Sequence, residues 1–454
     1  MISIGSGSRY RPDAGRAVLR EGVDYLFMDF MSESTLPRAY LKKRRGRPGF
    51  DEKWLTRSLE AFLPPAERHG TTIVTNAGAA DPRAAGERAL EIAREADVSL
   101  DVTVVTGDDC TDLVRARAEE FGVDPGAMLS ANAYIGAEEI VGALERPPGR
   151  DGDGVHLVVG GRIADHSLIV APIVHEFGWD LDQWDELGWA TAVAQLLECD
   201  YQATGGYFME PGRKPVPDPH RLGLPIADVH ESGRAVIRKP EGSGGRIDRA
   251  TLREQLFYEI HDPSAKLTPD VTADLTGVRF EAVGEDEVAV TGGTGRERPS
   301  DLKVLVGTAG GFRVEARKPY AGPNAEGRAR MAGEIVRDRL DLVHGVEDVE
   351  ELRTNVVGVD AVFGSASTLS VPFDGEVELR VAARTTTEET AELVFDEVSS
   401  LAPVGPAAGI GNPYSMNDSI ERIVDVDAVY LPREAVVDAI EHTSLRAGAT
   451  PEGR

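Results

Sequence analysis

Short apolar runs alternate with longer amphipathic stretches along the first half of the chain. Six runs rich in β-branched and aromatic residues predict strands at 2–5, 25–30, 72–76, 102–106, 128–134 and 156–160. Apolar positions at helical spacing predict helices between them at 14–21, 54–69, 82–96, 112–121 and 138–144. Near-continuous apolar strands separated by helices are typical of a parallel sheet buried on both faces. The first half is therefore predicted to be α/β, a mostly parallel sheet with flanking helices, either doubly wound or closed into a barrel.

The pattern changes after a proline-rich segment at 210–225, which holds five prolines and resembles a linker. Further β patterns follow at 229–239, 277–283, 287–291 and 303–307, then a helix near 326–342 and an alternating strand at 376–383. Segregated strands and helices indicate an α+β fold. We therefore expect two domains, an α/β ligand-binding domain over 1–215 and an α+β domain over 216–454.

The net charge of the chain limits the classes of molecule that it is expected to bind. The 454 residues include 49 Lys and Arg against 77 Asp and Glu, a net charge of −28, and no basic stripe interrupts the acidic surface. Such a chain repels nucleic acid, so no nucleic-acid partner is expected. Only eight of the basic residues are lysines, and a lysine-poor acidic surface predicts a halophilic protein, because concentrated salt screens self-repulsion.

Neither the apolar runs nor the N-terminus indicate a membrane. No run approaches the ~18 consecutive apolar residues of a membrane span, and the first residues lack the layout of a signal peptide. Two cysteines, Cys110 and Cys199, cannot build a disulfide framework. We expect a cytoplasmic protein with no membrane association.

Glycines and polar residues gather where the predicted strands end. These clusters contain Gly5 and Gly7, Asp29, Asn76 and Gly78, Asp108 and Asp109, Asn132, and Gly161 and Arg162. Ligands of open α/β sheets and of barrels bind beyond the carboxyl ends of the strands. The sequence therefore predicts a ligand pocket formed by these clusters.

The Gly5-Ser6-Gly7 loop contains half of a dinucleotide-binding motif. Tyr10 occupies the position of the third glycine, whereas Asp29 falls where a ribose-binding carboxylate is expected. Backbone N–H groups of this loop are predicted to bind a phosphate or carboxylate. An NAD(P)-linked oxidoreductase stays open as an alternative.

Acids and one arginine are the strongest candidates for chemistry. Asp108 and Asp109 stand side by side after a strand, where they could hold a divalent metal, or one could be a general base. Capping of the next helix by Asp109 is the structural alternative. Arg162, beside two glycines, is predicted to clamp a carboxylate or phosphate, with Asp165 at the start of a buried helix.

Two later segments add candidates. Gly205-Gly206-Tyr207 is a glycine turn that carries an aromatic hydroxyl, and His261 lies in a run with acids on both sides and Lys266 behind it. The predicted catalytic residues are Asp108, Asp109, Asp165 and His261. The predicted substrate-binding residues are Gly5, Gly7, Asn76, Gly78, Asn132, Gly161, Arg162, Gly205, Gly206 and Tyr207.

Several long blocks together resemble the acyclic terpene utilisation family, the AtuA-type proteins. They include DYLFMDFMSESTL, IVTNAGAADPRAA, VVTGDD, GGRIADHSLIVAPIVHEFGWD, LLECDYQATGGYF, EQLFYEIHDPSAKLTPDV and VELRVAARTT, and the resemblance spans about residues 4–413. It implies a role in the catabolism of acyclic isoprenoid or branched organic acids, handled as coenzyme A esters. The resemblance transfers membership of these sequence blocks to the residues quoted and assigns no catalytic role to any of them.

Two departures from the family pattern affect what the resemblance implies. Many relatives have a more glycine-rich first loop, where this chain has Ser8 and Arg9, and many carry a further C-terminal module. We expect a homo-oligomer, with a separately encoded small subunit as a candidate replacement for that module.

Together these features predict a cytoplasmic catabolic enzyme that acts on a branched or isoprenoid acid or its CoA thioester. A lyase or hydratase step is favoured because the sequence contains no complete oxidoreductase fingerprint, P-loop or nucleophile elbow. Asp108 or Asp109 would move the proton, while Arg162 and the Gly5–Gly7 loop would hold the carboxylate or pyrophosphate. The cofactor is unassigned, with a divalent metal as one candidate. The alternative from another class is a non-catalytic binding or scaffold subunit of an acyl-CoA-processing complex.

Overall fold

A computed structural model describes residues 1–145, 154–406 and 419–446, which form two compact units. The large unit comprises Met1–Gly307 and Val426–Arg454, and the small unit comprises Thr308–Asp425. No helix in the described part of the chain is both long and apolar enough to cross a membrane.

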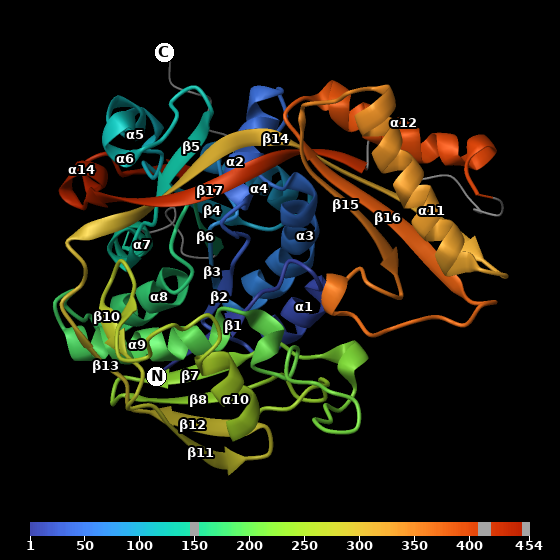
Figure 1. Ribbon diagram of the computed structural model, residues 1–454. Coiled ribbons are helices and arrows are strands. Elements are labelled where there is room, and N and C mark those ends of the chain that lie inside the picture. Colours follow the sequence, from blue (N-terminus) through green and yellow to red (C-terminus); the bar gives the residue numbers. More distant parts are fainter. Residues whose placement is uncertain (146–153, 407–418, 447–454) are drawn as a thin grey trace. The chain divides into compact units, whose positions relative to one another are not determined.

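A ten-stranded mixed sheet forms the centre of the large unit (Figure 1). Its middle strands are parallel and follow one another in the order β1 (Ile2–Ser6), β2 (Tyr25–Met28), β3 (Thr72–Thr75), β6 (Val155–Gly160) and β4 (Leu100–Thr106). Antiparallel strands extend it beyond β1, in the order β7 (Ile226–His230), β8 (Arg234–Arg238), β12 (Glu287–Thr291) and β11 (Arg279–Gly284). At the other edge β18 (Glu441–Leu445) pairs with β4. The end strands β11 and β18 do not pair, so the sheet is open and the barrel alternative is not what the structure shows.

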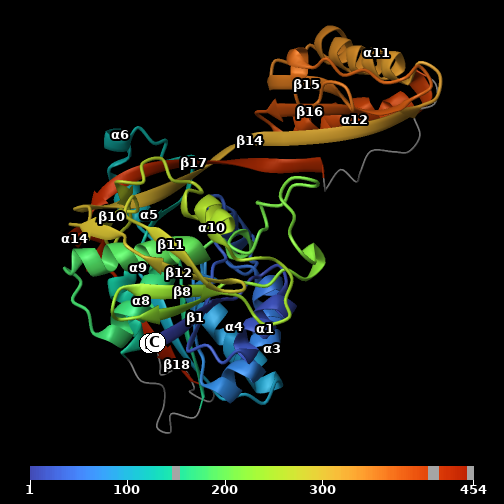
Figure 2. The ribbon, with the colours of Figure 1, turned by 90° about the horizontal axis from the view of Figure 1, so that it is seen from below.

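Helices cover both faces of the parallel strands (Figures 1 and 2). One face packs on α1 (Pro12–Arg20), α3 (Glu52–His69) and α4 (Pro82–Glu95), and the other on α7 (Ala137–Leu144), α8 (Ser167–Phe177) and α9 (Trp184–Leu197). Alternate residues of each strand enter opposite cores. In β2, Leu26 and Met28 face the first set of helices, whereas Tyr25 and Phe27 face the second. This burial on both faces is the reason that the strands read as continuous apolar runs.

The rest of the large unit lies outside this sheet. β5 (Met128–Ala133) pairs with β14 (Asp301–Ala321), and a small sheet has the order β13 (Thr294–Arg296), β10 (Thr272–Asp274) and β9 (Lys266–Leu267). The remaining helices are α2 (Thr35–Arg44), α5 (Thr111–Ala116), α6 (Ala118–Phe121), α10 (Arg249–Leu256) and α14 (Glu434–Val437), with short 3₁₀ turns at Asp200–Gln202 and Pro219–Arg221.

Over the described residues of the small unit, a sheet packs on two helices, α11 (Ala325–Asp338) and α12 (Glu388–Val404). β15 (Val349–Val357), β16 (Glu376–Thr385) and β14 are antiparallel neighbours, and β17 (Ile420–Pro432) follows β14 in the sheet order. Alternate residues of β16 face α11 and α12, which explains the strict alternation at 376–383 in the sequence. The small unit also contains a π-helical turn at Arg339–Val343 and a 3₁₀ turn at Gly364–Ala366.

The structure confirms a mixed α/β fold and corrects two expectations about it. The run at 128–134 is a strand, but it pairs with β14 and does not join the parallel sheet. The strands after the proline-rich segment do not start a separate sheet, because β7 pairs directly with β1. The predicted boundary at residue 215 does not coincide with the compact units, and as a statement about independently folding domains it stays a prediction.

Candidate functional site

The five parallel strands end at one edge of the sheet, and a glycine or a polar residue follows each of them there. Gly7 follows β1, Asp29 follows β2, Asn76 follows β3, Arg162 follows β6 and Asp108 follows β4. A hydrogen bond between Asn76 and Asp29 joins the loops after β3 and β2. Another, between the backbone N–H of Arg162 and Asp108, joins the loops after β6 and β4. The loops that the sequence marked as ligand-binding therefore lie together.

Charged side chains from four segments meet at this edge and form what we call the charged cluster, Asp29, Arg162, Asp165, Glu198 and Lys266. Asp29 follows β2, Arg162 and Asp165 lie between β6 and α8, Glu198 directly follows α9, and Lys266 begins β9. Arg162 is 1 % exposed, and the other four side chains keep only partial contact with solvent. Three carboxyl groups and two cations in such surroundings perturb one another strongly.

Burial and like charge move the pKa values of two of these acids toward neutrality. Burial raises the pKa of Asp29 to about 7, and repulsion by Asp165 adds to the effect. Burial likewise raises the pKa of Glu198 to about 8, although the attraction of Lys266 opposes it. Burial lowers the pKa of Lys266, and Glu198 opposes that shift. Acids with pKa values near neutrality are suited to proton transfer.

The guanidinium of Arg162 is held in place by hydrogen bonds from two of its three nitrogens. Its Nη1 and Nη2 donate to Asp165 Oδ1 at 2.9 and 3.0 Å, and Nη1 also donates to the carbonyl of Ile163 at 3.0 Å. The guanidinium carbon lies 3.9 Å from the centroid of the Tyr134 ring. Burial lowers the pKa of Arg162, but Asp165 and Tyr134 outweigh burial, so the group stays charged. Its Nε is buried without a hydrogen-bond partner in the described part of the chain, and it could donate to a carboxylate or carbonyl oxygen.

Asn76, predicted to bind substrate, positions Asp29. Its Nδ2 donates to Asp29 Oδ1 at 2.6 Å, while its Oδ1 accepts from the backbone N–H of Phe30 at 2.8 Å. Asp29 Oδ1 also accepts from the backbone N–H of Met31. The completely buried Asn76 thus fixes one oxygen of a carboxyl group whose other oxygen is not engaged by these donors.

Asp108, predicted to be catalytic, is buried and joins three segments. Its Oδ2 accepts from Asn132 Nδ2 at 2.8 Å and from the backbone N–H of Arg162 at 3.0 Å. Burial raises the pKa of Asp108 to about 6. A Cβ on Gly161 would lie 2.4 Å from Asp108 Oδ1, so this glycine permits the close contact. In this geometry Asp108 and Asn132 fix the backbone that presents Arg162.

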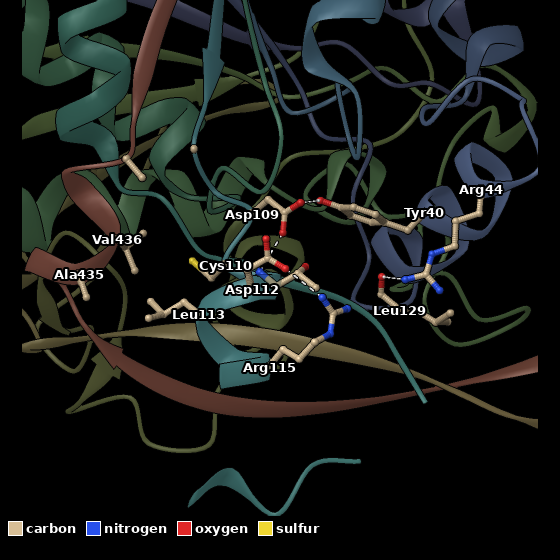
Figure 3. Close-up of a pocket in the computed structure, with 13 residues that line it drawn as sticks. Tyr40, Arg44, Asp109, Cys110, Asp112, Leu113, Arg115, Leu129, Ala435 and Val436 are labelled. Atoms are coloured by element: carbon tan, nitrogen blue, oxygen red, sulfur yellow. Dashed lines mark hydrogen bonds and ion pairs between the residues drawn. The ribbon is translucent and has the colours of Figure 1, made fainter. Parts of the chain in front are cut away.

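Asp109, unlike Asp108, lines a cavity of about 460 Å³ (Figure 3). The figure shows the Tyr40 hydroxyl directed at Asp109 and Arg115 directed at Asp112, and the two pairs are 2.8 and 2.9 Å apart. Asp109 Oδ1 also accepts from the backbone N–H of Thr111 at 2.9 Å, a turn contact two residues along the chain, whereas the N-cap of α5 is Cys110, which makes no side-chain cap hydrogen bond. The neighbouring acids thus have different partners.

Four of the glycines predicted to bind substrate lie where chain segments approach too closely for a side chain. They are Gly5, Gly7, Gly78 and Gly161. A Cβ on Gly5 would lie 2.2 Å from Val18 of α1, and one on Gly78 would lie 2.6 Å from the carbonyl oxygen of Gly160. Close packing accounts for these glycines, and contact with a substrate stays a prediction.

The last predicted residues come from the segments after α9 and α10. Gly205 has φ +111°, a conformation that favours glycine, and Gly206 lies beside the Tyr201 backbone. Tyr207 is 73 % exposed and its ring lies 5.7 Å from that of Tyr258. His261 is exposed and is not part of the charged cluster.

Comparison with known proteins now adds to this geometry. The family model described as acyclic terpene utilisation family protein AtuA matches residues 2–442. The chain belongs to the AtuA family. The resemblance stated from the sequence blocks is therefore confirmed, and it associates the chain with the utilisation of acyclic terpenes. No curated protein and no solved structure matches it.

The described residues of this AtuA-family chain contain no group of three or more His, Cys, Asp or Glu placed to hold a metal ion. Asp108 and Asp109, the predicted metal ligands, engage different partners. A metal bound by these two acids stays a prediction.

Two members of the charged cluster were given no role from the sequence of this AtuA-family chain. Glu198 follows a helix whose residues from Leu187 to Leu197 are all buried, and its own side chain is only 10 % exposed. The apolar run before Glu198 was the available signal of this burial. Lys266 reaches the cluster from β9, and no local pattern reveals that approach.

Proposed function

We propose that this chain is a cytoplasmic enzyme of acyclic terpene or branched-acid catabolism that moves a proton beside the carbonyl of an isoprenoid or branched acid or its CoA thioester. The charged cluster carries the proposal. Within it, Asp29, with a pKa of about 7, interacts with the buried guanidinium of Arg162. Glu198, with a pKa of about 8, interacts with Asp29 and Lys266. Family membership supports the substrate class.

In the proposed hydratase or lyase step, each residue has one task. Arg162 Nε donates to the carbonyl oxygen and stabilises the negative charge that develops there. Asp29, ionised in part of the molecules near neutral pH, takes a proton from water as the oxygen adds to the β-carbon. Glu198, mostly protonated at that pH, gives its proton to the α-carbon. Elimination runs the same steps backwards.

The assay follows isoprenoid and branched acids and their CoA thioesters by NMR in D₂O, where hydration or α-deuteration is visible directly. We expect Glu198→Gln and Asp29→Asn to lower turnover by about 100-fold or more, the usual contribution of a general acid or base. Asp112→Asn is the control, because the Asp112 side chain is 99 % exposed. The same assay on Asp108→Asn and Asp109→Asn tests their predicted catalytic role.

Three outcomes would contradict the proposal. Wild-type turnover in both Glu198→Gln and Asp29→Asn would remove the charged cluster from the reaction. Tight binding of an acyl-CoA without turnover would favour a binding or scaffold subunit. Turnover that requires NAD(P) would favour an oxidoreductase.

Light scattering of the purified chain tests the further proposal of a homo-oligomer, with or without a small subunit.

A further inference from the structure

A buried histidine outside the predicted site lies against the charged cluster. His166 precedes α8 and is 8 % exposed, and its Nε2 lies 2.8 Å from Oε1 of the completely buried Gln195. The Nε2 of Gln195 donates to the backbone carbonyls of Gln255 and Tyr258, both at 3.2 Å. Gln195 therefore presents its oxygen to the histidine, and Nε2 of His166 must carry the proton.

The opposite ring nitrogen faces the proposed proton donor. His166 Nδ1 lies 3.5 Å from Oε2 of Glu198, whose side chain is 10 % exposed. In a neutral imidazole protonated at Nε2, Nδ1 presents a lone pair. A lone pair opposite a carboxylate anion is repulsive in a buried site, whereas opposite a protonated carboxyl group it is a hydrogen-bond acceptor.

The charges around this pair favour the neutral arrangement. Glu198 is approached by Asp29 from the end of β2, by Asp165 from the loop before α8, and by Glu259 from the segment after α10. Lys266 on β9 is the nearby cation, and it acts on both Glu198 and His166. Burial lowers the pKa of His166 well below its ordinary value, and Lys266 lowers it further. An imidazolium is therefore disfavoured beside a carboxyl group that is itself disfavoured as an anion.

We propose that His166, held by Gln195 with its proton on Nε2, is a positioning residue that keeps Glu198 in its protonated, proton-donating form. This inference rests on the proposed function for its catalytic meaning. The protonation states that it assigns can be measured without any substrate.

NMR of protein labelled with ¹⁵N-histidine tests the assignment, because the two nitrogen shifts report which ring nitrogen carries a proton. We expect His166 to show Nε2 protonated and Nδ1 bare throughout the neutral pH range. His156 is the matched control, since it is 7 % exposed and its Nε2 lies 2.9 Å from Thr103 Oγ1. His166→Asn and His156→Asn assign the two signals. An imidazolium at neutral pH, or a proton on Nδ1 in place of Nε2, would overturn the proposal.

Gln195→Glu changes the partner of the histidine with little change of shape. A carboxylate at this position stabilises a positive ring, so His166 should become doubly protonated and Glu198 should ionise. Turnover near neutral pH should then fall about tenfold or more, with its optimum displaced toward acid and KM nearly unchanged. A doubly protonated His166 with unchanged turnover in a folded Gln195→Glu variant would overturn the proposal, and the wild-type spectrum decides alone if this variant does not fold or keeps His166 neutral.

The two proposals fail in different measurements. If Glu198→Gln loses turnover while His166 is an imidazolium in the wild type, the reaction stands and the positioning role is wrong. If His166 has the expected tautomer while Glu198→Gln keeps full turnover, the proposed reaction is wrong. The interaction of His166 with Glu198 then has no role in catalysis.

Discussion

Individual carboxyl groups in the charged cluster make the stability of this protein depend on pH in an unusual direction. Asp29 and Glu198 have folded-state pKa values of about 7 and about 8, whereas carboxyl groups of an unfolded chain titrate near 4. The folded protein therefore binds more protons than the unfolded chain above pH ~4, and these groups reduce stability as pH rises through that range. His156 and His166, whose pKa values are lowered by burial, act in the opposite direction only below pH ~6.5.

We accordingly predict that the free energy of unfolding falls between pH ~6.5 and ~8, where the two acids keep protons in the folded protein that they have already lost in the unfolded chain. Chemical denaturation at several pH values measures it. Glu198→Gln cannot ionise and should flatten the dependence most at the alkaline end, whereas the exposed Asp112→Asn should leave it unchanged. A stability that rises over this range, equally in wild type and Glu198→Gln, would show that Glu198 is not buried as a neutral acid.

Part of the charged cluster could be predicted from residue type and from position relative to the predicted strands. Asp29, Asn76, Arg162 and Asp165 stand at strand ends, which local patterning predicts, and the structure brings them together. The local sequence does not indicate which acid becomes buried beside which cation. Asp108 has the same strand-end position as Asp29, but its oxygens face Asn132 and the backbone, so its partners differ.

At the scale of elements, the packing of α1 on β1 depends on one missing side chain. Gly5 lies in β1, and a Cβ there would approach Val18 Cγ1 of α1 to 2.2 Å. We predict that Gly5→Ala destabilises the fold by about 1–3 kcal/mol, the usual cost of overpacking a core. Gly277→Ala is the control, because its nearest contact would be 3.4 Å away, and we expect a change within about 1 kcal/mol.

Denaturant unfolding of both glycine variants separates packing from ligand contact at Gly5. A Gly5→Ala protein as stable as the Gly277→Ala protein would contradict the packing interpretation. It would return Gly5 to the substrate-binding role that its place in a GxG loop predicts.

The local pattern of apolar residues predicted the positions of most strands but not the strands with which they pair. β1, β2, β3, β4 and β6 lie within two residues of the predicted runs, since buried strands are short apolar segments flanked by turns. The partners of β5, β7 and β18 are far away in sequence: β5 pairs with β14, β7 with β1, and β18 with β4. Such pairings depend on tertiary contacts, which the alternation of apolar and polar residues does not encode.

The charge of the whole molecule predicts how it responds to salt. A net charge of −28, from 49 basic and 77 acidic residues, repels itself in dilute buffer and costs folding free energy. Molar KCl shortens the Debye length to ~3 Å and removes most of this repulsion. We predict a melting temperature that rises with KCl, by about 1–2 °C for each kcal/mol gained in a chain of this length.

The same protein supplies the control for this salt effect. Near pH 4.8, the isoelectric point of the sequence, the net charge vanishes and the repulsion vanishes with it. If screening is the cause, added KCl should stabilise the protein at neutral pH much more than near pH 4.8. Equal gains at the two pH values would assign the effect to general salting-out, and a protein more stable in dilute buffer than in molar KCl would contradict a halophilic character altogether.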